Sequence, residues 1–112
     1  MGQYVIAIYR PKDGKEAELL GCVRSHMAVL RAEGLVTERD ALVLRAPDGA
    51  IVEMFEWRSP EAVAAAHHNE AVRGLWARFD ACSTFGTLAT LPGADTPFPN
   101  FELVEPDLPY AD

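Results

Sequence analysis

The stretch IVEMFEWRSPEAVAAAH, residues 51–67, passes from a strand pattern to a helix pattern within a few residues. Residues 51–57 are rich in β-branched and aromatic side chains, as buried strands are. Ser59 is suited to cap a helix and Pro60 to occupy its first position, so we expect a helix to start directly after the strand. The direct connection from this strand to this helix is the starting point for predicting the rest of the fold.

The segments before this stretch predict a strand, a helix and a hairpin. QYVIAIY (3–9) is short, β-branched and aromatic, which favours a strand. Apolar residues then recur every three or four positions and predict a helix over about 14–33, with Gly34 as its C-terminal cap. The turn sequence APDG joins two predicted strands, over about 40–46 and 50–57.

The segments after it complete one domain. Asn69 can cap a further helical segment that begins at Glu70, and STFGTLATL (83–91) alternates as a last strand would. The order β-α-β-β-α-β predicts an α+β, ferredoxin-like domain over residues 1–91. In this fold a four-stranded antiparallel sheet carries both long helices on one face.

Two apolar features remain outside that arrangement. The first and third predicted strands are apolar on both sides, so we expect a homodimer through sheet-to-sheet packing. Residues 92–112 form an acidic, proline-rich C-terminal arm. Apolar residues such as Phe98 and Phe101 predict that this arm packs on the domain or on the partner subunit, with FELVE (101–105) as a short strand. The arm has no Lys or Arg, and its acidic residues are Asp95, Glu102, Glu105, Asp107 and Asp112.

Composition and charge narrow the classes of function. The net charge is −7 and no basic patch is evident, so we expect no nucleic-acid partner. No apolar run approaches the ~20 residues of a membrane span, and the first residues lack a basic leader. We therefore expect a cytoplasmic protein without a membrane partner. Cys22 and Cys82 lie far apart without CxxC spacing and are expected to be free thiols.

Two carboxylates stand on the third predicted strand. Glu53 and Glu56 point to opposite faces, because side chains alternate along a strand. A buried carboxylate is costly unless it is paired. We therefore expect one of them to pair with Arg45 or Arg58, or to accept a hydrogen bond from a histidine. Both are candidate catalytic residues, and a purely structural pairing is the alternative for each.

The motif HHNEAV (67–72) interrupts the second predicted helix. His67 and His68 would point about 100 degrees apart on a helix and could not hold one metal ion together, so we expect no metal site. His67 is a candidate general base, the alternative being a histidine that satisfies a helix-end carbonyl. His26 flanks the apolar face of the first helix and is expected to be partly exposed. The candidate substrate-binding residues, which could also be plain core, are Tyr9, Trp57, His68, Trp76 and Phe79.

Over about residues 3–91 the chain resembles the dimeric α/β-barrel superfamily, in particular the antibiotic-biosynthesis-monooxygenase-like proteins. The resemblance rests on VIAIYRPKDGKEAELL as strand and helix, on IVEMFEWRSPEAVAAAH, and on the helix break HHNEAV. It implies a homodimer whose sheets face each other. It also implies a small-molecule pocket in each subunit, between the sheet and the helices.

The same resemblance implies a small-molecule-binding protein that acts as a cofactor-independent monooxygenase on an aromatic or quinone-type substrate. The family's oxygenases often use a tryptophan and a histidine, for which Trp57 or Trp76 and His67 are available. They also often use an asparagine in the first strand, and QYVIAIY has none. This departure supports the alternative, a non-catalytic dimeric module that binds a small apolar or aromatic ligand or serves in assembly.

Overall fold

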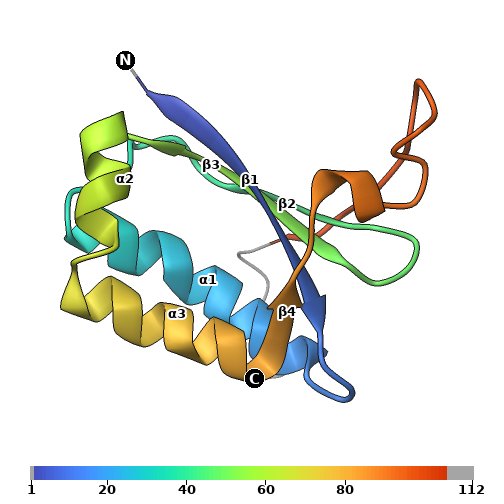
Figure 1. Ribbon diagram of the computed structural model, residues 1–112, viewed down its shortest axis with the longest axis horizontal. Helices are drawn as coiled ribbons and strands as arrows, with labels where there is room; N and C mark the ends of the chain where they lie inside the picture. The colour runs from blue at the N-terminus through green and yellow to red at the C-terminus, as the bar shows by residue number, and fades with distance from the viewer. Residues whose placement is uncertain (1, 106–112) are drawn as a thin grey trace.

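The computed structural model describes residues 2–105 and has an α+β fold (Figure 1). Residues 106–112, the end of the predicted arm, lie outside the described residues. The described strands are β1 (Gln3–Pro11), β2 (Leu42–Arg45), β3 (Ile51–Trp57), β4 (Ser83–Phe85) and β5 (Glu102–Leu103). The described helices are α1 (Glu16–Ala32), α2 (Pro60–Ala66), α3 (Glu70–Cys82) and the 3₁₀ helix η1 (Leu88–Thr90).

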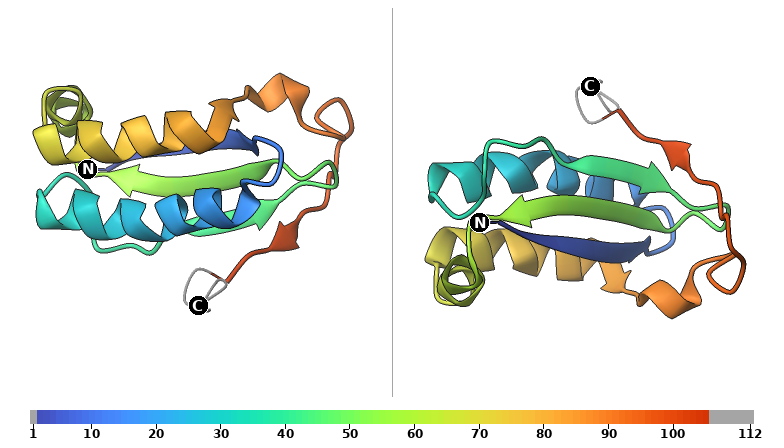
Figure 2. Two further views of the ribbon diagram at one scale, coloured as in Figure 1. Left: turned by 90° about the horizontal axis from the view of Figure 1, so that it is seen from below. Right: turned by 90° about the horizontal axis from the view of Figure 1, so that it is seen from above.

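The strands form one antiparallel sheet in the order β4-β1-β3-β2-β5. Helices α1 and α3 lie side by side on one face of the sheet (Figure 2). This arrangement is compatible with the predicted ferredoxin-like fold. The sheet has five described strands rather than the predicted four, because β5 pairs with β2 at the edge. The sequence predicted the short strand itself but not its place in the sheet.

The helix ends follow the predicted capping residues. Gly34 adopts a φ of 70° after α1, and the Leu35 amide donates to the Leu30 carbonyl at 3.0 Å. The Ser59 hydroxyl accepts from the Ala62 amide in the first turn of α2, and Pro60 is the first residue of the helix. The Asn69 side chain accepts from the third amide after it and starts α3. The HHNEAV motif is thus a true helix break.

The last predicted strand is shorter than expected. Residues 83–91 were predicted as one strand, but β4 ends at Phe85 and η1 follows. The cause is tertiary: the Arg10 guanidinium donates to the Thr90 carbonyl at 3.0 Å, and the Thr90 hydroxyl donates to the Thr87 carbonyl at 2.7 Å. The first bond ties η1 to a residue of β1, and the second closes the turn of η1 itself.

The two faces of the sheet are covered differently. The helix-covered face packs two buried clusters against α1, α2 and α3. On the second face, which carries no α-helix among the described residues, the arm covers one end. There Phe101 of the arm, and Leu91 just before the arm, pack in the cluster that holds Ile8 and Val52. The other end is open, and three of its residues are well exposed: Tyr4 (58%), Ile6 (44%) and Leu42 (46%).

The described part of the arm, residues 92–105, lies against its own domain at two places. Phe101 packs on the second-face cluster, and Val104 is buried with the helix-side core. The Val104 amide donates to the Val43 carbonyl at 2.9 Å. Phe98, by contrast, is 86% exposed within the single chain.

Candidate functional site

Glu53 lies in the middle of β3 on the helix-covered face and has no exposed surface. Its Oε1 atom accepts a hydrogen bond from the Tyr9 hydroxyl at 2.7 Å. The same oxygen lies 2.9 Å from Nδ1 of His26, a residue of α1. Strand pairing places Tyr9 opposite Ile51, diagonally next to Glu53 on the same face of the sheet. The cluster is therefore set by the β1–β3 register and by α1 above it.

The direction of the hydrogen bonds follows from the side chains involved. The Trp76 indole N–H on α3 donates to Nε2 of His26 at 3.0 Å. An indole nitrogen can only donate, so Nε2 carries no proton in this arrangement. Nδ1 then carries the ring proton and donates it to Glu53. The chain of bonds runs from Trp76 through His26 to Glu53.

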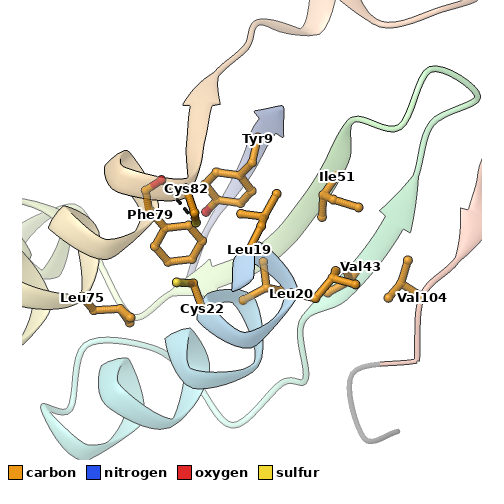
Figure 3. Packing of buried hydrophobic residues seen from close by; sticks show 11 residues of the cluster. Tyr9, Leu19, Leu20, Cys22, Val43, Ile51, Leu75, Phe79, Cys82 and Val104 are labelled. Atoms are coloured by element: carbon orange, nitrogen blue, oxygen red, sulfur yellow. Dashed lines mark hydrogen bonds between the residues drawn. The ribbon is translucent and has the colours of Figure 1, made fainter. Parts of the chain in front are cut away.

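Aromatic rings surround this cluster. The rings of Tyr9 and Phe79 (Figure 3) stack with centroids 4.7 Å apart. The His26 ring meets Phe79 at 5.0 Å and Phe55 at 5.2 Å, both edge-on. Burial in these apolar surroundings, and then the charge of Glu53, raise the pKa of Tyr9 well above its ordinary value. The Tyr9 hydroxyl therefore stays protonated and donates to the carboxylate.

The second oxygen of Glu53, Oε2, is buried and has no hydrogen-bond partner among the described residues. An ionised carboxylate can only accept hydrogen bonds, so this oxygen calls for a donor. Leaving a buried polar group unsatisfied costs about 1–3 kcal/mol. Within the described residues, Oε2 is the one buried side-chain oxygen or nitrogen that lacks a hydrogen-bond partner. It is therefore a candidate contact atom for a ligand.

A cavity of about 350 Å³ lies beside the cluster, between α1 and the β2–β5 edge of the sheet. Val43 lines it and pairs directly with Glu53 across β2 and β3. Val23 and Met27, which flank His26 along α1, also line it. Glu53 and His26 do not line the cavity themselves, but residues adjacent to each of them do. The charged residues of its lining are Arg24, Arg31, Asp40 and Glu105.

Four of the residues singled out from the sequence meet in this cluster: Glu53, Tyr9, Trp76 and Phe79. Of the pairings expected for the carboxylates, Glu53 accepts from a histidine. Arg45 instead binds Glu16 at 2.7 Å and Glu102 at 2.5 Å. Arg58 donates to a backbone carbonyl.

Glu56 lies on the second face of the sheet, away from the cluster. Its Oε1 accepts from the Thr37 hydroxyl at 2.9 Å and lies 3.0 Å from Nε of Arg39. Trp57 is on the helix-covered face, where its ring meets Phe55 at 5.2 Å in a separate part of the core. Neither residue is hydrogen-bonded to the Glu53 cluster.

The two adjacent histidines are exposed at the end of α2. The His67 ring packs edge-on against Trp76, with centroids 5.1 Å apart, and so touches the outer end of the hydrogen-bond chain. His68 lines a shallow surface hollow with Glu70 and Arg73. His67 is thus separated from Glu53 by the indole and by His26.

The central histidine, His26, was expected to be partly exposed, and this prediction is wrong. Its exposed fraction is 3%. Val23 and Leu30, three residues before it and four after it, are both buried, so the helical spacing itself placed His26 on the buried face. A polar residue on an apolar stripe near a buried glutamate was the signal that could have found the pair.

Other chemistry-bearing groups lie elsewhere. Cys22 and Cys82 are free, buried thiols where α1 meets α3. Burial first, and then the neighbouring Cys82, raise the pKa of Cys22 to about 11, so this thiol is protonated at neutral pH. No group of three or more His, Cys, Asp or Glu among the described residues could hold a metal ion. No helix of the described chain is long and apolar enough to cross a membrane.

Comparison with known proteins adds no relative. No family model, no curated protein and no solved structure matches the chain. A functional assignment therefore rests on the geometry of the Glu53 cluster and on the two faces of the sheet.

Proposed function

We propose that the protein is a small-molecule-binding protein whose ligand is an aromatic compound bearing a hydroxyl group. The ligand enters the cavity between α1 and β2, displaces the Val43 side chain and donates a hydrogen bond to Oε2 of Glu53. The observation that carries this proposal is the buried Oε2 atom without a partner. A ligand hydroxyl would satisfy it, and the rings of Tyr9 and Phe79 would supply apolar contact.

The size and lining of the cavity support this proposal. Its volume of about 350 Å³ falls at the lower end of the ~300–1,000 Å³ of small-molecule sites. Its inner wall is apolar, formed by Val23, Met27 and Val43. β2 is only four residues long, so a small shift of Val43 disturbs few strand contacts. These features fit a small aromatic ligand better than a large or highly charged one.

The reaction we propose is oxygenation of a phenol without a cofactor. Glu53 takes the phenolic proton, and the electron-rich ring reacts with dioxygen. One oxygen atom enters the ring as the second carbonyl of a quinone. The other leaves as water, with the hydroxyl hydrogen and one ring hydrogen. The phenol supplies all the electrons, so the balance closes without an external reductant.

The test uses 1-naphthol as the probe, with oxygen uptake and quinone absorbance as readouts. The wild type is expected to consume one dioxygen for each naphthoquinone formed. Glu53→Gln, which replaces the accepting oxygen by a donating amide, should reduce the rate by about a hundredfold or more. Glu61→Gln, an exposed carboxylate on α2, is the matched control and should not change it. Equal rates in the wild type and Glu53→Gln would refute the role of Glu53.

A non-catalytic dimeric module is the second candidate, and two observations favour it. Both ring nitrogens of His26 are engaged, one by Trp76 and one by Glu53, so no free base stands beside the carboxylate. The open end of the second face, with Tyr4, Ile6 and Leu42, offers a surface for sheet-to-sheet packing with a second copy. Binding of 1-naphthol in a thermal-shift assay without oxygen uptake would favour this candidate.

A further inference from the structure

We propose that Trp76 is a positioning residue that keeps His26 neutral, so that Glu53 has no counter-cation and Oε2 depends on a ligand for its hydrogen bond. This role of Trp76 rests on the proposed function only for the identity of the ligand. The protonation state of His26 is a property of the ligand-free protein. Trp76 was expected from the sequence to wall a pocket, and its hydrogen bond assigns it this other role.

The geometry of the His26 ring carries the first step. The Trp76 N–H points at Nε2 across 3.0 Å, and an indole nitrogen cannot accept a hydrogen bond. A proton on Nε2 would bring two N–H hydrogens face to face. The ring therefore holds a single proton, on Nδ1, which is 2.9 Å from the Glu53 Oε1 atom.

The surroundings of the pair carry the second step. A histidine in contact with a buried carboxylate would ordinarily take a second proton and form an ion pair, because each charge stabilises the other. The other titratable groups that the described structure places around the pair are the Tyr9 hydroxyl, the Cys22 thiol one helical turn earlier on α1, and His67, whose ring packs on Trp76. Tyr9 and Cys22 are kept protonated by raised pKa values and bring no positive charge, and the indole separates His67 from Glu53. The indole N–H occupies Nε2 of His26 and so prevents the ring from becoming a cation beside Glu53.

The consequence concerns the carboxylate. Tyr9 and His26 both donate to Oε1, and no described residue donates to Oε2. The cluster thus presents a buried carboxylate that two hydrogen bonds to Oε1 hold in place and whose second oxygen, Oε2, has no donor among the described residues. A ligand that brings an acidic O–H or N–H fits it, and a ligand that brings only acceptors, such as a quinone or an ether, does not.

The first experiment measures the ring nitrogens of His26 by ¹⁵N NMR in the ligand-free wild type at neutral pH. We expect one protonated nitrogen, Nδ1, and one unprotonated nitrogen, Nε2, with a coupling from Trp76 through the hydrogen bond. A doubly protonated ring, or a proton on Nε2, would overturn the proposal. This measurement needs no variant and does not depend on any ligand.

The second experiment uses Trp76→Phe, which removes the N–H and keeps an aromatic ring. We expect His26 to take up a second proton at the same pH. The affinity for 1-naphthol should fall about tenfold, because the positive charge of the imidazolium offsets the charge of Glu53 and weakens its pull on the ligand's hydroxyl, although Oε2 still lacks a donor. Trp57→Phe is the matched control, since Trp57 makes no recorded hydrogen bond to His26, and it should leave the ring singly protonated. An unchanged His26 ring in folded Trp76→Phe would overturn the role of Trp76. If 1-naphthol binds neither protein, the proposed ligand fails while the NMR result still decides the inference.

Discussion

Glu53 and Glu56 lie three residues apart on β3, one on each face of the sheet, and their surroundings differ in kind. On the helix-covered face Glu53 is fully buried among aromatic rings, with two neutral donors on one oxygen and none on the other. On the second face the Glu56 side chain is 15% exposed and faces the Arg39 guanidinium and the Thr37 hydroxyl. Glu56 thus forms an ion pair near the surface, whereas Glu53 on the helix-covered face has an unsatisfied acceptor oxygen. Only the surroundings of Glu53 favour the binding of a ligand.

The largest effect is expected in the aromatic packing of the helix-covered face. Phe79→Ala removes the ring that stacks on Tyr9 and touches His26, and it leaves a cavity in the buried cluster. The free energy of unfolding should fall by about 3–5 kcal/mol in urea titration. Phe98→Ala, at a side chain that is 86% exposed, is the control and should change it by less than about 0.5 kcal/mol. Similar losses in both variants would mean that the buried cluster is not the packed core described.

The next effect tests the open end of the second face. Ile6→Glu places a charge at a residue of the open end that is 44% exposed in the single chain and is paired with Met54 of β3. If a second copy covers this end, the dimer dissociation constant should rise by about a hundredfold, or ~2.7 kcal/mol. Ala65→Glu, on exposed α2, should leave it unchanged. Sedimentation of the wild type as a monomer at micromolar concentration would contradict the dimer.

The comparison of the two glutamates predicts effects of opposite sign. Glu53→Gln removes an uncompensated buried charge and should raise the free energy of unfolding by about 1 kcal/mol. Glu56→Gln loses a partly buried ion pair and should lower it by about 0.5–1 kcal/mol. Urea titration at pH 7 measures both changes. A loss of stability in Glu53→Gln as large as that of a broken ion pair would show that the carboxylate has a cationic partner.

The smallest effect concerns the contact between the end of β1 and the turn before β3. Arg10 lies 2.6 Å from Asp48, and this hydrogen bond holds the pKa of the Asp48 carboxyl below its ordinary value of 3.8. Because the folded value is lowered, the contribution to stability is present above the ordinary pKa and is lost as the pH falls through the lowered one. Both side chains are about a third exposed, so the effect is about 0.5 kcal/mol or less.

The measurement is the difference in unfolding free energy between pH 6 and pH 3 for the wild type and Asp48→Asn. The variant should show a slightly smaller loss on acidification. An equal or larger loss in Asp48→Asn would indicate that the Arg10 contact does not act through the Asp48 charge.

Local patterns predicted most of the fold, and long-range contacts account for the differences. The caps at Ser59 and Asn69 depend on a few neighbouring residues, and the structure confirms them. The end of β4 depends on hydrogen bonds between Arg10 and Thr90, which are far apart in the sequence. The pairing of β5 with β2 likewise joins distant segments, so a single-strand pattern could not reveal it.

The candidate site was also predictable only in part, because its residues come from distant segments of the chain. The alternation of β3 placed Glu53 and Glu56 on opposite faces and predicted that one of them needs a partner, without deciding which. Tyr9, Trp76 and Phe79 were predicted only as residues that could line a pocket. His26 was missed because its helix was judged by its apolar stripe alone. The unsatisfied Oε2 atom could not be foreseen, since it results from three elements meeting at one side chain.

The most direct test of the central claim compares two ligands that differ only in a hydrogen-bond donor. Titration calorimetry would measure the affinity of 1-naphthol and of 1-methoxynaphthalene for the wild type and for Glu53→Gln. If Oε2 of Glu53 receives the ligand's hydroxyl, the wild type should prefer 1-naphthol by about tenfold or more, and Glu53→Gln should lose this preference. Equal binding of both ligands to the wild type, or a preference that persists in Glu53→Gln, would contradict the account.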